Sequence, residues 1–207
     1  MPADTPSRDP SLDGNAPDSS PLALVLIDTI SDMEFPGGES LFRFALPAAR
    51  CIAGLKRRAK ACGVPVVYAN DNFGRWRSDF HEVVEHCSRK GARGRPIVEL
   101  LAPEEDDYFV LKPKHSAFYA TTFDLLLNYL GSRRLIMTGF SGDICVLLSA
   151  SDAYMRDFRI NVPSDCVASV AARYSERGLA YMRRVLDVDT TASDALDLPL
   201  LLAQMRE

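Results

Sequence analysis

The sequence predicts an α/β protein of three layers, with helices on both faces of a mainly parallel sheet of five or six strands. Two observations lead to this prediction. Short continuous apolar runs, such as ALVLI at 23–27 and RLIMTGF at 134–140, are typical of strands buried on both faces. These runs alternate with segments of helical apolar spacing, which is the pattern of βαβ units. The expected sheet is therefore Rossmann-like.

The elements of the first half follow this alternation in order. ALVLI is the first strand, and a helix with basic residues between its apolar positions runs from about 46 to 61. Gly63 supplies its stop signal. VPVVYAN at 64–70 is the second strand, and the polar segment at 71–96 is expected to hold a loop and a helix.

The second half continues in the same way. Its expected elements are a strand at 108–112, a helix at 121–131 closed by Gly131, a strand at 134–140 that leads into a helix, a strand at 158–163, a helix at about 170–186, and a short sixth strand in LDVDT at 186–190.

Length and composition limit the classes of protein. A chain of 207 residues suits one domain, and the polar, Pro- and Asp-rich residues 1–20 are expected to form a disordered tail before a single domain at 21–207. The formal net charge of -4 argues against nucleic acid or an anionic membrane as partner.

No apolar run reaches the roughly 18 residues of a membrane span, and no apolar signal core is present, so a cytoplasmic location is expected. The odd number of cysteines, five, favours reduced thiols.

Reactive side chains follow three of the expected strands. Asp28 ends the first, Lys112 ends the third, and Ser141 and Cys145 lie in the elbow after the fourth. Ligands of open α/β sheets bind beyond the carboxyl ends of the strands, where the strand order reverses. We therefore expect these groups to meet at one edge of the sheet.

Ser141 and Cys145 compete as the candidate nucleophile. The serine elbow of α/β-hydrolases reads G-x-S-x-G, but Asp143 occupies the second glycine position here. Cys145 lies in the first turn of a helix, where the helix dipole and free N–H groups favour thiolate over thiol. The alternative for Cys145 is simple packing against the sheet.

Asp28 needs a cationic partner, because an unpaired carboxylate at the end of a buried strand is costly. Lys112 and Lys114 both qualify, since alternate residues of an extended chain face the same side.

Three motifs of this sequence resemble, in the same order along the chain, those of the isochorismatase-like cysteine hydrolases. This superfamily includes nicotinamidases and N-carbamoyl amide hydrolases. The three motifs are ALVLIDTISDMEFPGG at 23–38, KPKHSAFYATT at 112–122 and TGFSGDICVLLSASDA at 138–153, and the similarity continues through VPSDCVAS. The resemblance covers about residues 21–190, and the spacing in the second motif selects Lys112 over Lys114.

The resemblance implies an Asp28-Lys112-Cys145 triad on an isochorismatase-like fold. Cys145 would attack a carbonyl carbon, Asp28 would carry the proton, and Lys112 would hold both in place. It also implies a non-proline cis peptide bond between Phe140 and Ser141. That bond would direct the backbone N–H of Ser141, with that of Cys145, at a developing oxyanion.

Two differences from members of this superfamily narrow the expected reaction and the expected metal content. Isochorismatases lack the cysteine, so its presence favours amide or ureide hydrolysis. Nicotinamidases carry a D-x-H…H metal signature after the second strand, where this chain has Asp71 and neither histidine. No metal and no cofactor are therefore expected.

The substrate pocket is the least defined part of the site. A cationic or aromatic side chain can bind a carboxylate or stack on a planar group. The candidates are Phe35, Asn72, Arg75, Trp76, Phe118 and Phe140, with Arg77 as a further possibility. For the residues that follow the second strand, the alternative is a solvated basic loop.

The resulting hypothesis is a metal-independent cysteine amidohydrolase that cleaves a small amide, ureide or N-carbamoyl compound through a thioester. The alternative is a small-molecule binding or assembly protein that keeps this fold without catalysis. By resemblance, the chain is expected to assemble as a homodimer or homotetramer.

Overall fold

A computed structural model describes residues 18–74 and 79–204. Its centre is a six-stranded sheet in which every pairing is parallel and the strand order is β3-β2-β1-β4-β5, with β6 paired to the end of β4. The strands are β1 (Leu22–Ile27), β2 (Val66–Asp71), β3 (Tyr108–Lys112), β4 (Arg134–Phe140), β5 (Arg159–Asn161) and β6 (Val167–Ala168). The three-layer parallel fold expected from the sequence is confirmed.

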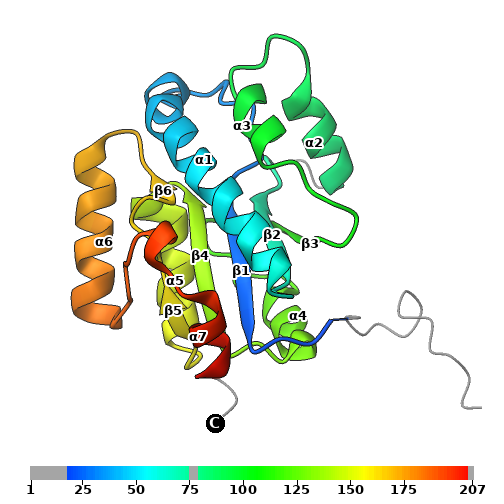
Figure 1. The fold of residues 1–207 in the computed structure, drawn as a ribbon. Helices are drawn as coiled ribbons and strands as arrows, with labels where there is room; N and C mark the ends of the chain where they lie inside the picture. The colour runs from blue at the N-terminus through cyan, green and yellow to red at the C-terminus, as the bar shows by residue number, and fades with distance from the viewer. Residues whose placement is uncertain (1–17, 75–78, 205–207) are drawn as a thin grey trace, which may run out of the picture.

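Helices cover both faces of the sheet (Figure 1). They are α1 (Gly38–Ala61), α2 (Phe80–Ser88), α3 (Arg95–Leu100), α4 (Phe123–Leu130), α5 (Leu147–Tyr154), α6 (Ala172–Leu186) and α7 (Leu198–Ala203). A π-helical turn, η1 (Gly142–Val146), links β4 to α5, and a 3-10 turn, η2 (Ser193–Ala195), precedes α7. Residues of α1, α2, α3 and α7 form the core on one face, and residues of α4, α5 and α6 form the core on the other.

Burial of β1 on both faces explains why its sequence is apolar without interruption. Leu22, Leu24 and Leu26 pack into the α1 side, whereas Ala23, Val25 and Ile27 pack into the α4–α6 side, and all six are fully buried. Successive side chains of a strand point to opposite faces, so a strand covered on both faces must be apolar at every position.

Helix α1 begins at Gly38, well before the expected start near residue 46. Pro47, which lacks an N–H donor, lies inside this longer helix. The start is set by close packing, since a Cβ on Gly38 would lie 2.1 Å from the carbonyl oxygen of Met33. This close approach folds the β1–α1 loop back over the end of β1.

The sixth strand was placed wrongly from sequence. It is β6, within VPSDCVAS, whereas Asp189 of LDVDT makes a single isolated bridge with Asn161. The helix expected within 71–96 is α2, whereas α3 and α7 were not expected from the sequence. These are short helices, for which a periodic pattern has few residues to show itself.

Most of the expected N-terminal tail, residues 1–17, lies outside the described residues. Ser20 is buried, and its backbone N–H donates to the carbonyl of Leu130 at 2.8 Å. Among the helices that the structure describes, none is long and apolar enough to cross a membrane.

Candidate active site

Three strand ends meet at the carboxyl edge of the sheet, as expected. Asp28 follows β1, Lys112 is the last residue of β3, and Cys145 lies in η1 after β4. The strand order reverses between β1 and β4, which is where open α/β sheets bind ligands. A pocket of about 390 Å³ opens there, lined by Asp28, Ser31, Met33, Phe35, Leu41, Asp71, Phe73, His115, Phe140, Ser141, Ile144 and Cys145.

The partner of Asp28 is Lys112. The Lys112 Nζ lies 2.7 Å from Asp28 Oδ2, with the lysine side chain fully buried and the aspartate side chain 18% exposed. Asp28 Oδ1 accepts the backbone N–H of Asp71 at 2.7 Å, and Lys112 Nζ also donates to the Lys114 carbonyl at 3.3 Å. The ambiguity between Lys112 and Lys114 is therefore resolved, since Lys114 contributes its carbonyl to the pair.

The Cys145 sulfur has three polar neighbours. Asp28 and Ser141 line the same pocket, and both influence the pKa of the Cys145 thiol: the Asp28 side chain raises it, and the Ser141 backbone lowers it. On a further side lies His115, whose Nδ1 is 3.7 Å from Sγ. The histidine contact was not anticipated, because His115 follows Lys112 in a loop whose course the sequence does not reveal.

The electrostatics of the resting site differ from the expectation of a ready thiolate. Burial, and then the negative charge of Asp28, raise the pKa of the Cys145 thiol to about 12, against a smaller lowering by Lys112. Burial also raises the pKa of Asp28, and the charge of Lys112 opposes that shift. Two adjacent buried acids do not readily ionise at the same time, because two negative charges would then lie side by side away from water. The thiol is therefore protonated at neutral pH.

The expected cis peptide bond between Phe140 and Ser141 is present. Gly139 precedes it with φ at 119° and lies so close to β1 that a Cβ would be 2.0 Å from the Ile27 carbonyl oxygen. Only glycine fits this position. The close approach places the elbow that carries Ser141 and Cys145 directly beside the end of β1.

Two residues outside the three motifs fix the β1–α1 loop that forms a pocket wall. Asn70, buried on β2, accepts the Ile30 N–H at 3.0 Å and donates to the Ile30 carbonyl at 2.9 Å. Gly94 donates its N–H to the Asp32 carbonyl at 2.9 Å, and a Cβ there would lie 1.9 Å from the Ser31 carbonyl oxygen. Such supports depend on contacts between distant segments, which a single sequence does not reveal.

The expected pocket residues are only partly brought together. Phe35 and Phe140 line the pocket. Asn72 is buried and accepts the Gly74 N–H at 2.8 Å, so its side chain shapes a turn. Phe118 lies in the core on the α4–α6 side, with its ring 4.8 Å from that of Phe123, so it is not placed as a pocket wall. Arg75, Trp76 and Arg77 lie outside the described residues.

Asp71, the residue that matches the first position of the nicotinamidase metal signature, makes contacts within the protein. Its Oδ1 accepts the Phe73 N–H at 2.6 Å, and its Oδ2 lies 3.9 Å from Lys112 Nζ. In the ranges 18–74 and 79–204, no group of three or more His, Cys, Asp or Glu side chains is arranged to hold a metal ion.

Fold and site together define an α/β protein with a cysteine, an aspartate and a lysine at the carboxyl edge of a parallel sheet. The family model of the isochorismatase domain matches residues 22–193. The chain therefore belongs to the isochorismatase family.

Relatives and solved structures agree with this assignment. An uncharacterized isochorismatase family protein, YaaI of Bacillus subtilis, is 38% identical over 84% of this chain and 95% of its own length. A maleamate amidohydrolase of Pseudomonas putida is 27% identical over 89% of this chain and 86% of its own. The crystal structure of N-carbamoylsarcosine amidase from Thermoplasma acidophilum is 27% identical, covers 85% of this chain and 98% of its own, and superposes with a TM-score of 0.65. The family thus includes amidohydrolases.

Proposed function

We propose that the protein is a cysteine amidohydrolase that cleaves a carbon–nitrogen bond of a small molecule without a metal ion. Cys145 is the nucleophile, Asp28 carries the proton and Lys112 holds the Asp28 charge. The observation that supports this most directly is the contact of the Cys145 sulfur with a carboxylate that a fully buried lysine holds at 2.7 Å. The names of two relatives, a maleamate amidohydrolase and an N-carbamoylsarcosine amidase, point to the same reaction class.

The proposed reaction has two halves. In the first, the thiol proton moves to Asp28 while the sulfur bonds to the substrate carbonyl carbon, and the C=O π electrons move to the oxygen. The tetrahedral intermediate then collapses, the C–N bond breaks, and Asp28 returns its proton to the leaving nitrogen. In the second half, Asp28 takes a proton from water and the resulting hydroxide attacks the thioester. The C–S bond then breaks to release the carboxylic acid product, and Asp28 returns its proton to the sulfur, which regenerates the thiol and the carboxylate.

The elbow after β4 supplies the proposed oxyanion site. The Ser141 backbone N–H lowers the pKa of the Cys145 thiol, so it lies close to the atom that would attack. When the sulfur bonds to the substrate carbonyl carbon, the oxyanion that forms on the carbonyl oxygen would be within reach of this N–H and of the backbone N–H of Cys145. Ser141 would then act through its backbone amide, and its hydroxyl would be dispensable.

The proposal is tested by trapping the thioester. A panel of amides, ureides and N-carbamoyl acids is incubated with the protein, and the reaction with any hydrolysed compound is quenched in acid during turnover. Mass spectrometry should find the acyl group on the peptide that contains Cys145. Turnover with no acyl group on this peptide, or equal labelling of the other four cysteines, would argue against the mechanism.

Replacement of Asp28 by asparagine should separate thiol ionisation from catalysis. Asp28 raises the pKa of the thiol through its negative charge, so neutralising it should lower that pKa and leave Lys112 free to stabilise the thiolate. We expect alkylation of Cys145 by iodoacetamide at pH 8 to become about tenfold faster. Hydrolysis should nevertheless be lost, because the proton carrier is missing. An unchanged pH profile of alkylation, in a variant with native circular dichroism, would contradict the proposed pairing.

A further inference from the structure

His115 lies next to the proposed nucleophile, at the open side of the pocket. Its Nδ1 is 3.7 Å from the Cys145 sulfur, and its side chain is exposed. The residue lines the pocket and also a neighbouring cavity beside α5, so solvent reaches the ring. Imidazole can accept and donate a proton at neutral pH. A second proton carrier besides Asp28 is therefore within reach of the sulfur.

The loop that carries His115 is fixed against the helix that follows the nucleophile. Directly after the histidine, two hydrogen bonds join this loop to α5. Ser116 Oγ donates to Asp152 Oδ2 at 2.5 Å, and the Ala117 N–H donates to Ser149 Oγ at 2.9 Å. Helix α5 continues directly from η1, the turn that contains the nucleophile. The distance between imidazole and sulfur is thus set by hydrogen bonds between the two segments.

Hydrolysis of the thioester needs a base for water and then an acid for the departing sulfur. Both oxygens of Asp28 are already engaged, since Oδ2 lies 2.7 Å from Lys112 Nζ and Oδ1 accepts the Asp71 N–H at 2.7 Å. A base that activates water must have that water within hydrogen-bond reach, and the acid must reach the leaving atom. His115 meets both conditions, because solvent reaches its ring and its Nδ1 lies beside the sulfur.

On the triad alone, Asp28 carries the proton in both halves of the reaction. We propose that His115 takes over from Asp28 in the second half and is a further catalytic residue. The inference rests on the proposed amidohydrolase function and divides the work between two proton carriers. The largely buried carboxylate serves formation of the thioester, and the exposed imidazole serves its hydrolysis.

The second half then proceeds through the imidazole. The neutral ring takes a proton from water while the water oxygen bonds to the thioester carbonyl carbon, and the C=O π electrons move to the carbonyl oxygen. The tetrahedral intermediate collapses, the C–S bond breaks, and the imidazolium gives its proton to the sulfur. The carboxylic acid leaves, and the thiol and the neutral imidazole are restored.

Replacement of His115 by phenylalanine should slow the release of the acyl group and leave its formation unchanged. Phenylalanine keeps a flat ring but cannot carry a proton. With a compound that the wild type hydrolyses, rapid quench and mass spectrometry give the rate at which the Cys145 peptide is acylated and the fraction acylated at steady state. Turnover divided by that fraction is the rate constant of deacylation, and it should fall by about a hundredfold.

Hydroxylamine should restore acyl release in His115→Phe, since this nucleophile attacks a thioester without help from a base. We expect release to become at least about tenfold faster in the variant, with a smaller effect in the wild type. His115→Gln, whose amide forms hydrogen bonds but does not take up a proton, should show the same slow deacylation. His81→Phe is the matched control, because it makes the same change at an exposed histidine of α2, beside Phe109 and outside the pocket lining. It should keep both rate constants.

These outcomes distinguish the inference from the function on which it rests. If Cys145 is acylated but both His115 variants deacylate at the wild-type rate, the amidohydrolase function stands and the role of His115 is wrong. The same conclusion follows if both variants slow acylation and deacylation equally, which is the result of a distorted pocket. If the wild type hydrolyses no compound of the panel, or does so without an acyl group on Cys145, the proposed function fails and this inference fails with it.

Discussion

Replacement of Cys145 by alanine should reduce amide turnover by at least about a thousandfold, because the variant lacks the atom that forms the covalent bond. The loss should fall on kcat, since alanine leaves the Phe35, Phe73 and Ile144 walls of the pocket in place. Substrate binding should therefore persist. Steady-state kinetics would measure the first effect and thermal-shift titration the second.

The chain offers a matched control in Cys62, a half-buried cysteine at the end of α1. Cys62→Ala makes the same chemical change away from the pocket and should retain activity. Undiminished turnover in Cys145→Ala would exclude the cysteine mechanism. If that turnover then vanished in Ser141→Ala, the serine would be the nucleophile after all. Saturable binding with no turnover of any compound in the wild type would favour the non-catalytic alternative.

The positions of Asp28, Lys112 and Cys145 could be predicted because each depends on the local sequence around one strand end. ALVLID places Asp28 directly after a buried strand, and YFVLK places Lys112 at the end of an edge strand. The carboxyl ends of parallel strands share one edge. The resting state of Cys145 could not be predicted in the same way. The dipole at a helix terminus favours the thiolate. Burial and the charge of Asp28 come from the tertiary structure, and they raise the pKa of the thiol more strongly than this dipole lowers it.

The rest of the pocket depends on loops that no periodic pattern describes. His115 reaches the sulfur, and Asn70 and Gly94 hold the β1–α1 loop, through contacts between segments distant in sequence. Phe118 was misassigned as a wall because the motif that contains it does not show which way its side chain points, and the side chain lies in the core. The fold was easier to predict than the site, because a buried strand needs apolar residues at every position, whereas β6 has only two residues to carry such a signal.

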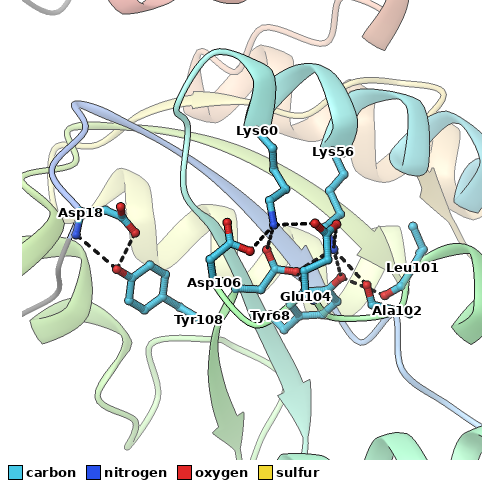
Figure 2. Close-up of polar contacts among 10 residues, drawn as sticks. Asp18, Lys56, Lys60, Tyr68, Leu101, Ala102, Glu104, Asp106 and Tyr108 are labelled. Carbon is cyan, nitrogen blue, oxygen red and sulfur yellow. Dashed lines mark hydrogen bonds and ion pairs between the residues drawn. The ribbon is translucent and has the colours of Figure 1, made fainter. Parts of the chain in front are cut away.

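A second strong effect is expected far from the triad motifs, in a cluster of charges that joins α1 to the segment before β3. Figure 2 shows Lys56 and Lys60 of α1 extending toward Glu104, Asp106 and their neighbours. Lys56 Nζ lies 2.6 Å from Asp107 Oδ2, and these two side chains are only 5% and 1% exposed. The same amino group donates to Tyr68 Oη at 3.1 Å and to the Ala102 carbonyl at 3.0 Å.

Replacement of Lys56 by methionine should lower the free energy of unfolding by about 3 kcal/mol. Methionine retains most of the aliphatic volume but removes the cation. The buried Asp107 carboxylate then keeps the Glu104 backbone N–H at 2.8 Å and, as its cation, the more distant Lys60 at 3.1 Å. The Tyr68 hydroxyl and the Ala102 carbonyl would also lose a donor in a region with little access to water. Urea unfolding followed by circular dichroism would measure the loss.

Lys60→Met is the matched control within the same cluster. Its side chain is 20% exposed and its partners Glu104 and Asp106 are largely exposed. Its third partner, the buried Asp107 at 3.1 Å, keeps Lys56 at 2.6 Å, so removal of Lys60 should cost about 1 kcal/mol or less and depend on salt. The double change Lys56→Met with Asp107→Leu should regain much of the stability lost in Lys56→Met, because the cost of that single change lies in the carboxylate it leaves uncompensated. Equal losses for the two lysines, or no recovery in the double variant, would mean that water reaches Asp107 and that the pair behaves as a surface ion pair.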